Sequence, residues 1–144
     1  MNANRRILKV FLGAPGDLQE ERKAASRVVE EENRNHAHIN GFQIELVGWE
    51  ETIAQQGRPQ AVINRDLEQC DYFVGIMWQR WGSPPGHLYS SGFEEEFCLS
   101  VERQEKTDKP EISLLFKTPL KDLLEDPGEQ LTKVLSFKEK LIKE

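Results

Sequence analysis

The most continuous apolar run of the chain, Tyr72 to Trp78 (YFVGIMW), constrains the fold more than any other segment. A short run without alternation is typical of a strand covered on both faces, as at the centre of a parallel sheet. Parallel neighbours need crossover connections, which are usually helices. We therefore expect this run to be the central strand of an α/β domain.

Three further segments read as strands, and amphipathic segments separate them. The expected strands are Ile7–Leu12 (ILKVFL), Phe42–Trp49 (FQIELVGW) and Ile112–Phe116 (ISLLF). The second begins with an alternating pattern, which is typical of a strand with one face better buried than the other. The expected helices begin at Asp17, Pro59, Ser91 and Glu129, with a short polar helical piece after Pro119 and a loop over Glu50–Arg58. Asp17 with Glu20, and Ser91 with Glu94, have the spacing of a capping box at the start of a helix.

This alternation of strands and helices predicts a parallel sheet with right-handed crossovers and helices on both faces. The expected architecture is a flavodoxin-like three-layer α/β/α sandwich whose four strands lie in the order 2-1-3-4. Many such folds add a fifth strand where this chain ends on a helix, and an unfinished sheet edge is a liability. We expect residues 1–144 to form one domain, the N-terminal module of a larger protein. The alternative is a complete small domain whose last helix covers the edge.

Composition narrows the class of partner. The 144 residues fit one domain. The net charge of −6 argues against nucleic acid, because phosphate backbones are bound by clustered Lys and Arg. No apolar run approaches the roughly 18 residues that cross a membrane, and the N-terminus lacks the apolar core of a signal peptide. Cys70 and Cys98 have neither metal nor disulfide spacing and read as reduced packing residues. These features predict a cytoplasmic protein without nucleic acid, membrane or metal.

Ligands of open α/β sheets bind beyond the carboxyl ends of central strands, so the loops after the first and third strands are the candidate site. The first loop reads Gly13-Ala14-Pro15-Gly16-Asp17 and opens a helix, where backbone N–H groups can cradle a phosphate. It matches neither G-x-G-x-x-G nor the lysine-bearing P-loop, and as a plain turn it needs no ligand. Trp78, Arg80 and Trp81 follow the third strand and could stack on a ring or pair with a phosphate. Packing that holds the long loop is the favoured alternative.

Three consecutive glutamates begin the helix after that loop. The helix macrodipole favours acidic residues there, which accounts for them without a ligand. At about 100° per residue, a buried stripe forms on Phe93, Phe97 and Val101. Glu95 then points away from the stripe, and Glu94 is the capping residue. Glu96 lies roughly 60° from Phe93, at the border where a carboxylate can face a cleft, and is the best candidate for chemistry.

Three stretches carry a family resemblance: Val10–Arg22 (VFLGAPGDLQEER), Cys70–Gly82 (CDYFVGIMWQRWG) and Ser90–Phe97 (SSGFEEEF). They resemble the bacterial family known as domain of unknown function 4062, and the resemblance extends through about Phe116. DLQEER and the aspartate-led third strand ending in W-x-R-W-G are its most specific parts. The chain has GAPG where the family more often has a Ser-Ser-Thr-type loop. The family resembles the Toll/interleukin-1 receptor (TIR) fold and typically forms the N-terminal module of larger NTPase or repeat proteins.

The resemblance also implies a chemistry. TIR enzymes carry a catalytic glutamate in a W-C-x-x-E pattern, and the related nucleoside deoxyribosyltransferases carry one in G-T-x-x-E. Both patterns align their glutamate with Glu96, and Phe93 stands in place of the TIR tryptophan. The resemblance thus implies cleavage of the nicotinamide–ribose bond of NAD, a substrate rather than a cofactor, in a defence or signalling protein. Loop 13–17 would seat the phosphates, and Trp81 or Trp78 would stack on a ring.

Two other functions remain open from the sequence. One is a non-catalytic interaction module that self-associates or docks C-terminal effector or sensor domains. The other, less favoured, is nucleoside deoxyribosyl transfer.

Overall fold

The computed structural model describes residues 6–47, 60–84 and 86–143. Its strands are β1 (Arg6–Gly13), β2 (Phe42–Val47), β3 (Tyr72–Met77) and β4 (Glu111–Phe116). Its helices are α1 (Gln19–Glu32), α2 (His38–Asn40), α4 (Gln60–Leu67), α5 (Gly92–Thr107), α6 (Lys121–Glu125) and α7 (Gly128–Lys143), with a π-helical stretch over Asn33–Ala37. The expected loop Glu50–Arg58, the helix start at Pro59 and the last two residues of the expected second strand lie outside the described residues.

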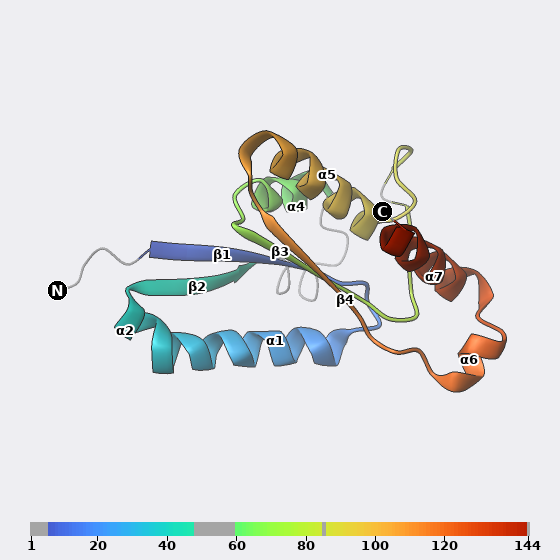
Figure 1. Ribbon diagram of the computed structural model, residues 1–144, viewed down its shortest axis with the longest axis horizontal. Coiled ribbons are helices and arrows are strands. Elements are labelled where there is room, and N and C mark those ends of the chain that lie inside the picture. Colours follow the sequence, from blue (N-terminus) through green and yellow to red (C-terminus); the bar gives the residue numbers. More distant parts are fainter. Residues whose placement is uncertain (1–5, 48–59, 85, 144) are drawn as a thin grey trace.

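The four described strands form one parallel sheet in the order β2-β1-β3-β4, which confirms the predicted α/β topology. The register pairs Phe11 with Phe73 and Gly13 with Gly75, so β1 and β3 end side by side. Helix α1 lies on one face of the sheet, and α4 and α5 lie on the other (Figure 1). The chain leaves β1 toward β2 and leaves β3 toward β4, in opposite directions. The carboxyl ends of β1 and β3 therefore form the switch point of the sheet.

The core lies on the face of the sheet that α4 and α5 cover. Phe73, Gly75 and Met77 of β3 are buried there. The ring of Phe73 stacks on that of Phe11 at 5.8 Å between centroids and lies 6.3 Å from that of Phe93 on α5. Aromatic contacts of this kind add about 0.5–1.5 kcal/mol each to the free energy gained from burial. This face accounts for the apolar run that marked β3 in the sequence.

The opposite face is less well covered. Tyr72, Val74 and Ile76 of β3 are only half-buried, and Leu115 of β4, on the same face, is 56 % exposed. Asn33, which directly follows α1, holds the end of this helix to the edge strand β2, away from β4. Its side-chain amide donates to the Ile44 carbonyl and accepts from the Ile44 N–H (2.8 Å each). Among the described residues, β3 is therefore covered on both faces, but more completely on the side of α4 and α5 than on the side of α1.

The start of α1 also differs from the prediction. Leu18, not Asp17, occupies the N-cap position, and no side chain caps the helix. Leu18 is fully buried, and Oδ2 of Asp17 instead accepts a hydrogen bond from the backbone N–H of Gln79 (3.1 Å). The carboxylate is thus used to hold the loop after β3. Helix α1 ends at Glu32, and the π-helical stretch and α2 follow it directly.

The start of α5 follows the prediction closely. Ser91 Oγ accepts from the Glu94 N–H (3.0 Å), as the capping box requires. The Glu94 carboxylate bonds the N–H of Ser90 (2.7 Å), one residue before the cap. Helix α7 begins one residue earlier than expected. The ring of its Phe137 packs against that of Phe97 on α5, with 5.2 Å between the ring centroids. The last helix therefore covers the same face as α5.

Both cysteines are free thiols; Cys70 is fully buried and Cys98 is half-buried. In the part of the chain that the structure describes, no helix is both long and apolar enough to cross a membrane.

Candidate functional site

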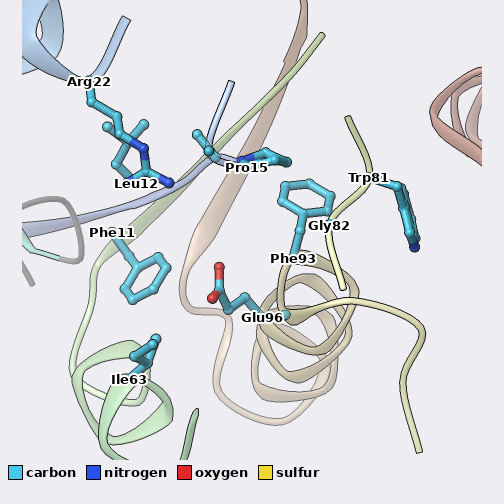
Figure 2. Close-up of a pocket in the computed structure, with 12 residues that line it drawn as sticks. Phe11, Leu12, Pro15, Arg22, Ile63, Trp81, Gly82, Phe93 and Glu96 are labelled. Atoms are coloured by element: carbon cyan, nitrogen blue, oxygen red, sulfur yellow. The ribbon is translucent and has the colours of Figure 1, made fainter. Parts of the chain in front are cut away.

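A cavity of about 220 Å³ lies at the carboxyl end of β1, between the loop that follows it and the first turns of α5 (Figure 2). It stands at the switch point between β1 and β3, where doubly wound sheets bind ligands. Its lining is mostly apolar, with one carboxylate and one guanidinium among the described residues. The lining residues are Phe11, Leu12, Ala14, Pro15, Gly16, Arg22, Ile63, Trp81, Gly82, Gly92, Phe93 and Glu96.

The three glutamates of α5 have three different environments. Glu94 Oε1 accepts from the backbone N–H and the hydroxyl of Ser90, 2.7 and 3.1 Å away. Glu95 accepts a short hydrogen bond from the Asn64 side chain on α4, so it contacts a neighbouring helix rather than pointing into bulk solvent. Glu96 lines the cavity, with its carboxylate directed away from the α5 axis toward β1 (Figure 2). Two of the three side chains hold the helix in place, and the third faces the cavity.

Gly13 sets how closely β1 approaches this carboxylate. A methyl group at Gly13 would lie 3.2 Å from Glu96 Oε1 and 3.0 Å from the Phe73 ring. The absence of a side chain therefore lets the strand end pack directly beside Glu96. A methyl group at Gly16, which lines the cavity, would meet nothing within 4 Å. The two glycines of the loop thus have different roles.

Arg22 is a cavity residue that the sequence analysis missed. It is only 2 % exposed, and its guanidinium points from α1 toward the cavity (Figure 2). Nε and Nη1 are buried and have no hydrogen-bond partner among the described residues. Burial lowers the pKa of this guanidinium, and the carboxylates of Glu96 and Asp17 oppose the shift. The missed signal was position: Arg22 lies four residues after Leu18, on the apolar stripe of α1.

Trp81 and Phe93 form one wall of the cavity and are committed to packing. Trp81 is 4 % exposed, and its indole N–H donates to Ser90 Oγ (2.8 Å). Its ring lies 6.1 Å from that of Phe93 and 5.3 Å from that of Phe137. The packing interpretation of Trp81 therefore accounts for its contacts, because little of its ring is left for a ligand to stack on.

Four of the expected binding residues, Gly13, Asp17, Trp78 and Arg80, lie outside the lining. Trp78 donates to the Thr118 carbonyl (3.0 Å), and the Lys117 ammonium lies 4.0 Å from the centre of its ring. Arg80 is exposed and does not line the cavity. Asp17 holds the loop after β3 through Gln79. The structure thus brings Ala14, Pro15, Gly16, Trp81, Phe93 and Glu96 together, with Gly13 at the border.

The arrangement places one anionic and one cationic side chain on an apolar cavity. A carboxylate in such a site stabilises positive charge that develops on a bound ligand, because the surrounding groups screen it less than water does. A guanidinium binds phosphate or carboxylate through its fork of donors. Among the described residues, no group of three His, Cys, Asp or Glu side chains is placed to hold a metal ion.

Comparison with known proteins gives one match. A family model described as domain of unknown function (DUF4062) matches residues 9–144. No curated protein matches the chain. No solved structure matches it either.

Proposed function

The chain belongs to the family described as domain of unknown function DUF4062, and we propose that its domain is TIR-like and cleaves the nicotinamide–ribose bond of NAD. On this proposal it acts in the cytoplasm, as the effector of a bacterial defence or signalling protein. The observation that carries the proposal is Glu96, whose carboxylate lines a cavity at the switch point of the sheet.

The chemistry fits a single carboxylate. Breaking the N-glycosidic bond builds positive charge on the ribose, as in glycoside hydrolysis. The Glu96 carboxylate would stabilise this oxocarbenium-like state or hold the ribose hydroxyls. Removing one well-placed electrostatic partner of a transition state typically lowers kcat by about 10²–10³-fold.

The size of the cavity sets how much of the substrate it encloses. At about 220 Å³ it is smaller than the roughly 300–1,000 Å³ of pockets that hold drug-sized ligands. It would therefore enclose the reacting ribose and an adjoining group, with the rest of the dinucleotide lying outside. Loop residues Ala14–Gly16 line the cavity and would face the phosphate nearest the ribose.

The test is nicotinamide release from NAD by the wild-type protein and by Glu96→Gln. Glu105→Gln is the matched control, because Glu105 lies on the same helix but is exposed and outside the cavity lining. Loss of release in Glu96→Gln alone supports the proposal. Equal rates in all three proteins would remove Glu96 from the mechanism.

A second candidate is a non-catalytic module that self-associates or docks neighbouring domains. The observation that favours it is the sheet edge, where β4 pairs with one of the described strands, β3, and Leu115 is 56 % exposed. Mass measured across protein concentration discriminates, since a strict monomer that turns over NAD contradicts it. Nucleoside deoxyribosyl transfer is a third and weaker candidate, which a base-exchange assay would reveal.

A further inference from the structure

We infer that Arg22 is an anion-binding residue of the cavity and that the ligand enters with a phosphate group against it. The inference rests on the proposed function in one respect, because it takes the ligand to be a phosphorylated nucleoside. The starting observation is that Nε and Nη1 of a 2 % exposed guanidinium have no hydrogen-bond partner among the described residues. Buried polar groups in folded proteins are rarely left in this state.

No ion pair between described residues accounts for Arg22. Burial lowers the pKa of the Arg22 guanidinium, and the carboxylates of Glu96 and Asp17 oppose that shift through charge. Asp17 Oδ2 accepts from the Gln79 N–H, and Oδ1 of Asp17 has no hydrogen-bond partner among the described residues. Arg22 and Asp17 therefore lie close enough to interact without forming a hydrogen bond. A buried guanidinium with free donors destabilises the unliganded protein, and a ligand that satisfies those donors removes that cost.

The surroundings of Arg22 suit a phosphate. Helix α1 begins at Gln19, three residues after Gly16 of the cavity lining, and no side chain caps its first turn, so its positive end lies near this corner of the cavity. Gly16 lines this corner and leaves open space where a side chain would stand. The guanidinium offers donors in a planar fork that matches two oxygens of a phosphate. Arg22 would thus hold the phosphate while Glu96, across the cavity, faces the ribose.

Binding can be measured apart from catalysis with two probes. ADP-ribose carries the pyrophosphate and lacks nicotinamide, and adenosine lacks any phosphate. We expect the 144-residue protein to bind ADP-ribose in calorimetric titration much more tightly than adenosine. Arg22→Met, which keeps an unbranched apolar stem but no charge, should weaken ADP-ribose binding about ten- to a hundredfold. The affinity of Arg22→Lys for ADP-ribose should lie between those of wild type and Arg22→Met, because an ammonium keeps the charge but lacks the planar fork of donors.

Thermal unfolding separates a binding role from a structural one. Without ligand, Arg22→Met should unfold at the wild-type temperature or about 2–4 °C higher, because it removes a buried charge whose Nε and Nη1 have no hydrogen-bond partner among the described residues. The matched control is Arg27→Ala, since Arg27 is exposed on the same helix and does not line the cavity; it should bind ADP-ribose like wild type.

Three outcomes would overturn the inference: wild type binds no ADP-ribose, Arg22→Met binds it unchanged, or Arg22→Met unfolds at a much lower temperature while its affinity is kept. Binding of ADP-ribose that depends on Arg22, without nicotinamide release from NAD, would support the inference and contradict the proposed function. Nicotinamide release with an unchanged KM in Arg22→Met would support the proposed function and contradict the inference.

Discussion

At the scale of single residues, Asp71 explains why an aspartate leads the third strand. Its Oδ2 accepts from the Lys9 N–H of β1 (2.9 Å), and its Oδ1 pairs with the Lys109 ammonium before β4 (2.9 Å). The backbone N–H of Asp71 donates to the Lys9 carbonyl, and the Asp71 carbonyl accepts from the Glu111 N–H. Burial would raise the pKa of this carboxyl, but the Lys9 hydrogen bond and Lys109 outweigh it, and the pKa is lowered. Asp71 thus joins three strands at the amino end of the sheet.

Replacing Asp71 with Asn should lower the free energy of unfolding by about 1–2 kcal/mol at pH 7, because the amide can still accept from Lys9 but loses the charge. The folded carboxyl has a lowered pKa, so its stabilisation is complete above the unfolded value of about 3.9 and is lost as pH falls through the folded pKa. Urea unfolding of both proteins from pH 7 to pH 3 should show the difference shrinking at the acidic end. A difference that stays constant to pH 3 would contradict the role of the charge.

The two glycines of the first loop give a matched pair of substitutions. Gly13→Ala would place a methyl group 3.0 Å from the Phe73 ring and 3.2 Å from Glu96 Oε1, and we expect a loss of about 1–3 kcal/mol in stability. Gly16→Ala meets nothing within 4 Å, and we expect no loss, or a gain of about 0.4–1 kcal/mol. Urea unfolding checks both. Equal stability of the two variants would show that the approach of β1 to Glu96 is not tight.

At the scale of elements, the start of α5 determines the direction of Glu96. The Trp81 indole donates to Ser90 Oγ, which also bonds Glu94, and Ser91 caps the helix. These contacts fix the rotation of α5 about its axis. Since side chains follow at about 100° per residue, that rotation places Glu96 on the cavity side.

Ser91→Ala should therefore cost about 1 kcal/mol of stability, within the range of about 0.5–2 kcal/mol for lost N-caps. Ser136→Ala is the control, because Ser136 is an exposed serine on α7. Chemical denaturation of the two variants measures the difference. If Ser91→Ala were as stable as Ser136→Ala, the cap would not anchor the helix.

The elements also show what the sequence could and could not predict. Local patterns sufficed for the strands, the strand order and the cap of α5, since apolar runs and Ser91-x-x-Glu94 act over a few residues. The prediction that Asp17 caps α1 was wrong, because its carboxylate accepts a hydrogen bond from the backbone N–H of Gln79, 62 residues away. Glu96 could be singled out by helical spacing. The position of Arg22 on the apolar stripe of α1 could have indicated its burial, but that it lines the cavity depends on how α1 packs against the end of β1.

At the scale of the whole molecule, the chain builds one well-packed layer and one sparse one. Helices α4, α5 and α7 cover the face that carries Phe73, whereas α1 leaves Leu115 on the other face exposed. The cavity opens where the two layers meet at the carboxyl ends of β1 and β3. Its two charged residues come from helices on opposite faces of the sheet, Arg22 from α1 and Glu96 from α5. A site of this kind exists only when both layers are assembled.

The measurement that tests the central claim most directly is the rate of nicotinamide release from NAD by wild type and Glu96→Gln, over a range of protein concentrations that allows for self-association. We predict release by wild type and by the control Glu105→Gln, and a rate at least about a hundredfold lower in Glu96→Gln. Equal rates in wild type and Glu96→Gln, or no release by wild type at any concentration, would contradict the claim.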